Sequence, residues 1–284
     1  MNGRWPQDLQ RAVATVAGEL GLVSPEVTPL PGGAANRALR LRDAQHDLVL
    51  RVAGAPSSAL GASRASECAM QALAAHAGLA PAIVLALPEQ GLLVARFADG
   101  RMLSREEAHD PGTIARVGRW IARLHALPPP RGLPYVDFGA RAAGYLQRLR
   151  AQSRGAEAGE IARRLDARRG SLPRAQPAAC HHDLHHRNFI DDGRRLLAVD
   201  WEYAGPGDPA ADLAAFAGYH DLGPSQVAAL LAGYGTDSAA LRARVAALGW
   251  IFDCLWYGWN AAAALTGVAP EPELQSRLAA RLLA

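Results

Sequence analysis

Apolar positions alternate with polar ones over several short stretches of the first hundred residues, and a period of two predicts strands. We expect these strands at 38–41, 47–52, 83–87 and 92–97. Two other stretches follow the helical period, an amphipathic one at 7–20 and a second at 65–77 that ends before Gly78. The first part of the chain is therefore predicted to be a β-sheet with two helices.

The pattern changes near 98–101, and helical periodicity dominates from there to the end of the chain. Helices are expected at 111–127, at 139–169 and, with breaks, from 208 onward. A short hairpin is expected between 189 and 200, around a turn that ends in Gly193. These elements predict an α+β fold with a small β-rich lobe at 1–97, a linker at 98–104 and a larger, mainly helical lobe at 105–284.

Composition removes several classes of enzyme. The chain has 284 residues, 30 basic and 27 acidic, with a formal net charge of +3, and every basic residue is Arg. Without Lys there is no Schiff-base or pyridoxal chemistry of the usual kind and no phosphate loop that ends in Gly-Lys-Ser/Thr. Any phosphate must therefore be bound by Arg, by backbone N–H groups or through a metal.

The distribution of charged residues and cysteines indicates which partners and which compartment to expect. The Arg-rich stretch 141–174 has few aromatic residues and is typical of a solvated helical face rather than a nucleic-acid site. The apolar stretch 245–265 carries Asp253 near its middle, which favours a buried helix over a membrane span. The three cysteines are too sparse for a disulfide framework: Cys68, Cys180 and Cys254. We expect a cytoplasmic protein, monomeric or homodimeric, that binds neither nucleic acid nor membranes.

The densest chemical signal is the run His-His-Asp-Leu-His-His-Arg-Asn at 181–188. One interpretation is a zinc site, because histidines four positions apart can share a helical face. Pro173 and Pro177 precede the run and a predicted hairpin follows it, so a long helix is not expected there. We interpret His182 and His186 as polar residues that face solvent. A zinc hydrolase remains the more distant alternative.

The other interpretation uses the oxygen-bearing side chains of this region. Asp183 can accept a hydroxyl proton, and Asn188 offers an amide oxygen. Asp200 ends the second hairpin strand, which folds back beside Asn188. An amide oxygen next to a carboxylate suits Mg²⁺, so the pattern indicates a phosphoryl-transfer site.

At this point the sequence resembles a known group of enzymes. The motif H-x-D-x-x-x-x-N is matched by His181, Asp183 and Asn188, and the metal-binding Asp of a D-F-G motif by Asp200. Both motifs, in order, resemble the superfamily of choline kinases, thiamine kinases and aminoglycoside phosphotransferases, which has a protein-kinase-like fold. Asp-Trp-Glu-Tyr-Ala-Gly at 200–205 is similar to the choline and thiamine kinase branch. The likeness covers most of the chain and is strongest over 180–215.

The resemblance implies a role for each matched residue of the second lobe. Asp183 corresponds to the catalytic base, and Asn188 and Asp200 to the Mg²⁺ ligands. His181 and Asp212 correspond to structural supports of the catalytic loop. Glu202 is expected to face the metal or the substrate.

In the first lobe the resemblance implies an ATP site. The loop that holds Gly32, Gly33 and Asn36 is similar to the one that covers the phosphates. Arg51 stands where protein kinases carry Lys, and Glu67 is similar to its acidic partner; a guanidinium can bind phosphate through two nitrogens. The segment that contains Ala95 and Phe97 resembles the hinge that binds adenine.

Aromatic residues in the last third suggest the acceptor. On a helix, Trp250, Asp253 and Tyr257 share one face and Trp256 and Trp259 an adjoining one. Aromatic rings with one carboxylate can surround a quaternary or aromatic cation. The same spacing is equally typical of a helix packed in the core.

These features together predict an ATP- and Mg²⁺-dependent kinase that phosphorylates the hydroxyl of a cationic alcohol, choline or ethanolamine first and thiamine next. An aminoglycoside phosphotransferase of the same fold is an alternative. A non-catalytic, kinase-like binding module is a second alternative of another class.

Overall fold

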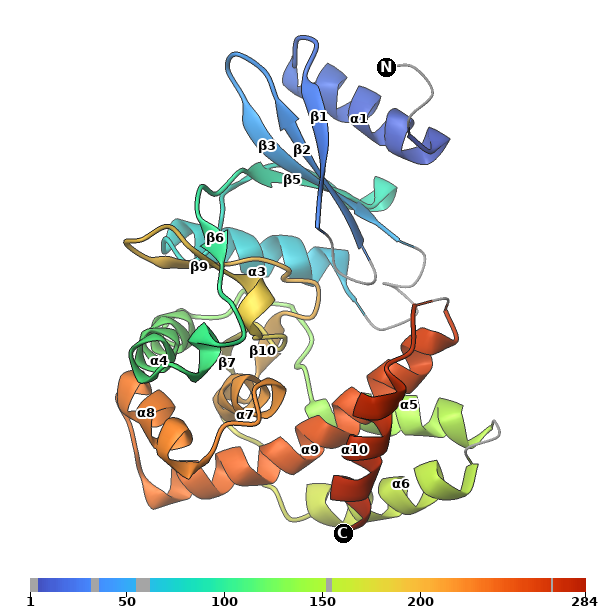
Figure 1. The fold of residues 1–284 in the computed structure, drawn as a ribbon, viewed down its shortest axis with the longest axis vertical. Helices are drawn as coiled ribbons and strands as arrows, with labels where there is room; N and C mark the ends of the chain where they lie inside the picture. Colours follow the sequence, from blue (N-terminus) through green and yellow to red (C-terminus); the bar gives the residue numbers. More distant parts are fainter. Residues whose placement is uncertain (1–4, 32–35, 55–61, 152–154, 267) are drawn as a thin grey trace.

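The computed structural model describes residues 5–31, 36–54, 62–151, 155–266 and 268–284. An antiparallel five-stranded sheet forms its first part, in the order β1-β2-β3-β5-β4 (Figure 1). Its strands are β1 (Glu26–Leu30), β2 (Asn36–Arg42), β3 (Asp47–Ala53), β4 (Ile83–Leu87) and β5 (Leu92–Arg96). Four of the five strands match the predicted ones. β1 was not predicted because Pro29 and its polar neighbours disturb the alternation.

Two helices flank this sheet. α1 (Gln7–Leu20) packs its apolar face, which includes Val13 and Val16, on Leu39 and Leu50 of the sheet. α3 (Arg64–His76) begins at Ser63, whose side chain accepts a hydrogen bond from the backbone N–H of Ser66. α3 lies between the sheet and the helical part of the molecule (Figure 1).

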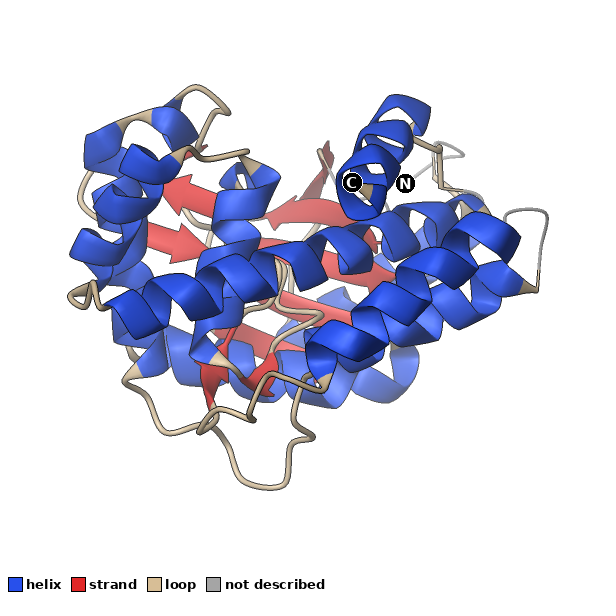
Figure 2. Cartoon of the chain, turned by 90° about the horizontal axis from the view of Figure 1, so that it is seen from below, coloured by secondary structure: helices blue, strands red, loops and turns tan. Residues whose placement is uncertain are grey.

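The second part is mainly helical, as predicted. Seen from below, its helices lie in front of the strands (Figure 2). The expected segment 139–169 is divided into two helices. In chain order the helices are α4 (Pro111–His125), α5 (Phe138–Arg150), α6 (Gly155–Arg169), α7 (Pro209–Tyr219), α8 (Pro224–Tyr234), α9 (Ala239–Ala264) and α10 (Pro272–Leu283). Among the described residues, no helix combines the length and the apolar character that crossing a bilayer would require.

Short strands and turns carry the chemically interesting loops. They are β6 (Arg101–Met102), η2 (Glu107–His109), β7 (Ala178–Cys180), η3 (His186–Asn188), β8 (Phe189–Asp191), β9 (Leu196–Ala198) and β10 (Gly205–Gly207). β8 and β9 form the predicted hairpin, and β6 pairs with β8. β7 pairs with β10, which brings the segment before residue 181 next to the segment after residue 204.

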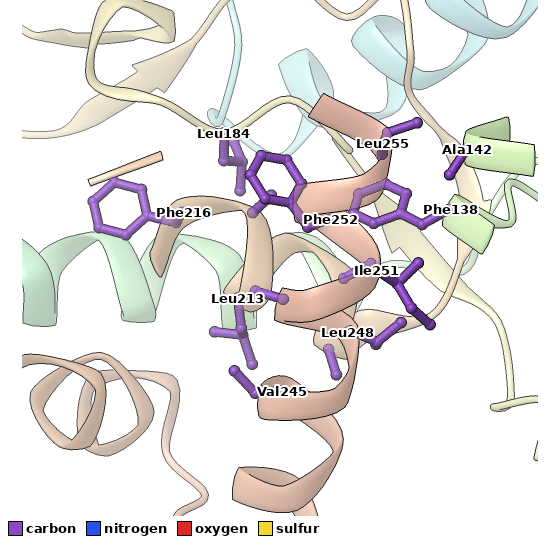
Figure 3. Close-up of a cluster of buried hydrophobic side chains, with 14 of the residues drawn as sticks. Phe138, Ala142, Leu184, Leu213, Phe216, Val245, Leu248, Ile251, Phe252 and Leu255 are labelled. Atoms are coloured by element: carbon purple, nitrogen blue, oxygen red, sulfur yellow. The ribbon is translucent and has the colours of Figure 1, made fainter. Parts of the chain in front are cut away.

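The core of the helical part is built around α9. Its side chains Ile251 and Phe252 point toward Leu213 and Phe216 of α7 and toward Phe138 of α5 (Figure 3). The fold is thus the α+β, two-part arrangement that the sequence predicted.

Two glycines allow α4 and α8 to approach closely. A Cβ atom on Gly118 of α4 would lie 2.4 Å from the carbonyl oxygen of Leu230. A Cβ atom on Gly233 of α8 would lie 2.4 Å from the carbonyl oxygen of Ala115. Because both neighbours are helix backbone, a side chain at either position forces the helices apart.

We therefore expect Gly118→Ala to lower the free energy of unfolding by about 1–3 kcal/mol, measured by urea denaturation. Gly18→Ala in α1 is the matched control, because a Cβ there meets no atom within 4 Å. That substitution should raise stability by about 0.5–1 kcal/mol. Equal stability of the two variants would contradict this account of the helix contact.

Candidate active site

The loop at 181–188 is held in place by a buried carboxylate. Asp212, in the first turn of α7, accepts hydrogen bonds from the backbone N–H groups of His181 (2.9 Å) and His182 (2.7 Å). The imidazole of His125 donates to the same carboxylate at 3.1 Å. Burial opposes the charge of Asp212, yet the hydrogen bond from His125 and the neighbouring donors hold its pKa at about 2. Asp212 therefore fixes the backbone of the loop, in the place that the sequence suggested.

The two histidines at the start of the loop are buried. His181 donates from Nε2 to the carbonyl oxygen of Val199 at 3.0 Å, which ties the loop to the end of β9. His182 is 3% exposed and packs against Phe138. Burial lowers the pKa of His182 to about 3. The expectation that His182 faces solvent is therefore wrong, because the turn at this residue directs its ring into the core.

Asp183 and Asn188 lie side by side. The side-chain amide of Asn188 donates to the backbone oxygen of Asp183 at 2.8 Å and to its carboxylate at 3.1 Å. The hydroxyl of Tyr219, at the end of α7, donates to the other carboxylate oxygen of Asp183 at 2.6 Å. Because the amide nitrogen of Asn188 is used in this way, its amide oxygen is directed away from Asp183.

Asp200 follows β9 in a left-handed conformation, with φ of 65°. The backbone N–H of Val199 donates to the carbonyl oxygen of Asn188 at 2.9 Å, so Asp200, just after β9, lies close to Asn188, just before β8. His182, with φ of 66°, is a second non-glycine residue of this region in the left-handed conformation. Such conformations cost of order 1–3 kcal/mol and cluster at functional sites.

Arg51 connects the sheet to this loop. Its guanidinium donates to Asp200 at 2.6 Å and to Glu67 of α3, whose side chain is fully buried. Burial disfavours the charge of Arg51, but Asp200 and Glu67 outweigh it and raise its pKa. The structure thus brings the predicted cation, its predicted acidic partner and Asp200 together.

Glu202 lies in the same region and is 5% exposed. It accepts a hydrogen bond from the side-chain amide of Asn36 at 2.7 Å. Burial, followed by the charge of Asp200, raises the pKa of Glu202 to about 7. Gly32 and Gly33, the other two residues expected in the phosphate-covering loop, lie outside the described residues.

The two residues expected at the hinge lie at the end of β5 and directly after it. Ala95 lies in β5, between β3 and β4. Phe97 follows directly, and its backbone N–H donates to the carbonyl oxygen of Asp47 at 2.9 Å. The guanidinium of Arg40 lies over the Phe97 ring, 3.6 Å from its centre.

The aromatic residues of α9 divide into two groups. Trp256 is half-buried and packs edge to face against Tyr219, with the ring centres 4.9 Å apart. The indole N–H of Trp259 donates to the hydroxyl of Tyr203 at 3.0 Å. These contacts place Trp256 and Trp259 on the side of α9 that faces Asp183. Tyr203 and Tyr219 were not predicted. Tyr203 lies within the quoted motif 200–205, whereas Tyr219 gave no signal in the sequence.

Asp253 and Tyr257 do not join this group. Asp253 is bound by Arg281 of α10, and the hydroxyl of Tyr257 donates to Glu157 of α6. The predicted sharing of one helical face is correct, but that face packs against α6 and α10. A substrate role for these two residues is not supported by their contacts.

A cavity of about 310 Å³ adjoins the site. Its walls include Glu202 and Tyr203, together with Asp137 and Arg141 at the start of α5. The guanidinium of Arg141 lies 5.1 Å from the centre of the Tyr203 ring. The cavity is therefore polar on the side of α5.

The histidine run does not form a metal cluster. Among the described residues, the group close enough to share an ion is His125, Cys180 and Asp212, on the buried side of the loop. Both oxygens of Asp212 already accept backbone N–H groups there. His186 instead contacts His220, with ring nitrogens 3.1 Å apart. His186 is half-buried, so the expectation that it faces solvent is correct only in part, because His220 at the C-cap of α7 covers one side of its ring.

Comparison with known proteins agrees with this geometry. Residues 26–248 match the model of the phosphotransferase enzyme family. A choline/ethanolamine kinase family protein from Mesorhizobium loti is 27% identical, with a TM-score of 0.75 over 97% of this chain and 94% of that one. A search among curated proteins found no match.

Two more distant structures share the fold. Choline kinase LicA from Streptococcus pneumoniae is 18% identical, with a TM-score of 0.77 over 97% of each chain. Spectinomycin phosphotransferase, in complex with ADP and spectinomycin, is 12% identical, with a TM-score of 0.67 over 93% of this chain and 91% of that one. The family match covers well over half of the chain and confirms the resemblance seen in the motifs, so the chain belongs to the phosphotransferase enzyme family.

Proposed function

We propose that this phosphotransferase is an ATP- and Mg²⁺-dependent kinase that phosphorylates the hydroxyl of a cationic alcohol, with choline or ethanolamine preferred and thiamine next. One observation carries the proposal. Tyr219 donates to Asp183 at 2.6 Å and packs against Trp256, so an aromatic surface lies directly beside the carboxylate. A cation on that surface would have its own hydroxyl near Asp183.

Asp183 is the proposed base. In this role it accepts the proton of the acceptor hydroxyl while that oxygen forms a bond to the γ-phosphorus and the bond from phosphorus to the β-phosphate oxygen breaks. The products are ADP and a phosphorylated alcohol. The hydrogen bond from Asn188 fixes the orientation of the carboxylate before substrate arrives.

The oxygen donors at the site fit a magnesium ion. Asn188, directly before β8, and Asp200, just after β9, offer an amide oxygen and a carboxylate, which are the hard ligands that Mg²⁺ prefers. When bound, the ion would neutralise charge on the phosphates. The nucleotide is proposed to lie between 1–97 and 105–284, with 98–104 as the connection and Arg51 directed at its phosphates.

The alternatives are less well supported. An aminoglycoside carries several ammonium groups and calls for several carboxylates, whereas Asp253, the carboxylate expected from α9, is bound by Arg281. A non-catalytic module has no need for Asp183, Asn188 and Asp200 to lie close together. All three lie together here.

We expect Asp183→Asn and Asp200→Asn each to reduce turnover by about 10²–10⁴-fold, because the first removes the base and the second a metal ligand. ADP release in the presence of choline measures the effect. Asp110→Asn, which alters the N-cap of α4, is the control and should keep its turnover. Near-normal activity of folded Asp183→Asn would contradict the proposed role.

The acceptor is tested by two tryptophans on one helix. Trp256→Leu should raise the KM for choline about 2- to 30-fold, equivalent to losing about 0.5–2 kcal/mol of cation–π contact, with little change in the KM for ATP. Trp250→Leu is the matched control, because that ring lies under Arg168 on another face. ADP release should rank choline, ethanolamine and thiamine above homoserine and kanamycin. A preference for kanamycin would favour the antibiotic kinase instead.

A further inference from the structure

Six side chains form a continuous series of hydrogen bonds between the sheet, α3 and the loop after β9, and both ends of the series lie in that loop. We call it the polar ring; its members, in order of contact, are Asp200, Arg51, Glu67, Arg64, Asn36 and Glu202. Arg51 donates to Asp200 at 2.6 Å, Arg64 donates to Asn36 at 2.7 Å, and Asn36 donates to Glu202 at 2.7 Å. Glu67 accepts from both arginines. The backbone between Asp200 and Glu202 completes the ring, because these residues are two positions apart in the chain.

Arg64 is more than an exposed partner of a helix neighbour. Its side chain is 16% exposed, and the Glu67 side chain that it shares with Arg51 is completely buried. One guanidinium nitrogen of Arg64 reaches Glu67 and another reaches Asn36. A lysine ammonium is a point charge without this planar fork, so it would not reproduce both contacts at once.

Asn36 connects Arg64 to the loop that carries Asp200. Its amide oxygen accepts from Arg64 while its amide nitrogen donates to Glu202, so both ends of the side chain are engaged. A second link lies close by, where the backbone N–H of Ser63 donates to the carbonyl oxygen of Glu202 at 3.3 Å. The start of β2, the start of α3 and the segment after Asp200 are therefore held as one unit.

We propose that Arg64 and Asn36 are positioning residues for nucleotide binding. Arg64 fixes Glu67 from the side opposite Arg51, so that Arg51 lies at the correct distance from Asp200. Asn36 fixes Glu202 and is itself the first residue of β2, directly after the loop expected over the phosphates. This inference rests on the proposed function, since it concerns the same nucleotide site.

Arg64→Lys tests the ring with little change in charge. We expect the KM for ATP and the Kd for ADP with Mg²⁺, measured by titration calorimetry, each to rise about tenfold, which corresponds to about 1.4 kcal/mol. The kcat at saturating ATP should stay within twofold of the wild-type value. Asn36→Ala interrupts the ring at another point and should change the same constants in the same direction.

Arg116→Lys is the matched control. Arg116 forms a similar two-nitrogen pair with Asp191, at 2.6 and 2.9 Å, away from the ring. That variant should lose thermal stability without any change in the Kd for ADP. A purely structural role of Arg64 predicts the same behaviour for Arg64→Lys.

The outcomes separate the two proposals. If the wild-type protein binds ADP and both ring variants bind it within twofold of wild type, the positioning role is overturned and the proposed kinase stands. If the wild-type protein neither binds ADP nor releases it from ATP, the proposed function itself fails. Weakened ADP binding in both ring variants, with normal binding in Arg116→Lys, supports the ring.

Discussion

The arrangement of the site depends on one buried carboxylate, that of Asp212. It satisfies two consecutive backbone N–H groups and the imidazole of His125 in a region that water does not reach. An unsatisfied donor in such a place costs about 1–3 kcal/mol. His182, the second of these donors, adopts a left-handed conformation, which turns the chain directly after it. The direction of Asp183, the next residue, follows from that turn.

The position of Asp200 relative to Asp183 is set by two hydrogen bonds to backbone carbonyl oxygens, one from the imidazole of His181 and one from the backbone N–H of Val199. His181 donates to the carbonyl oxygen of Val199, and Val199 donates to that of Asn188. The position of Asp200 therefore depends on the position that Asp212 gives to the loop at 181–188. From the other direction, Arg51 ties Asp200 to Glu67 and so to α3. The contacts that start from Asp212 and those that start from Glu67 meet at Asp200. This residue therefore fixes how the sheet lies relative to the helical part.

The sequence predicted the fold and the order of the motifs because both are local. Short alternation marks strands, and the spacing within 181–188 fixes which residues can meet. Long-range contacts follow other rules: Asn36 and Glu202 are 166 positions apart, and nothing in either neighbourhood marks them as partners. Helical spacing likewise placed Asp253 and Tyr257 on one face correctly. It contained no information about which helix that face would meet, and α6 and α10 occupy it.

Both carboxylates of the proposed mechanism, Asp183 and Asp200, already have partners. Tyr219 donates to Asp183, and Arg51 donates to Asp200, so binding of the proposed alcohol or nucleotide would exchange one polar contact for another and would not require an unpaired charge. This exchange also restricts the acceptor. Trp256 contacts the ring of the tyrosine whose hydroxyl reaches Asp183, so the aromatic surface and the carboxylate are separated by about one side chain. In the proposed reaction, few bonds would therefore lie between the cation and the hydroxyl of the acceptor, which supports the proposal of a small amino alcohol over a large sugar.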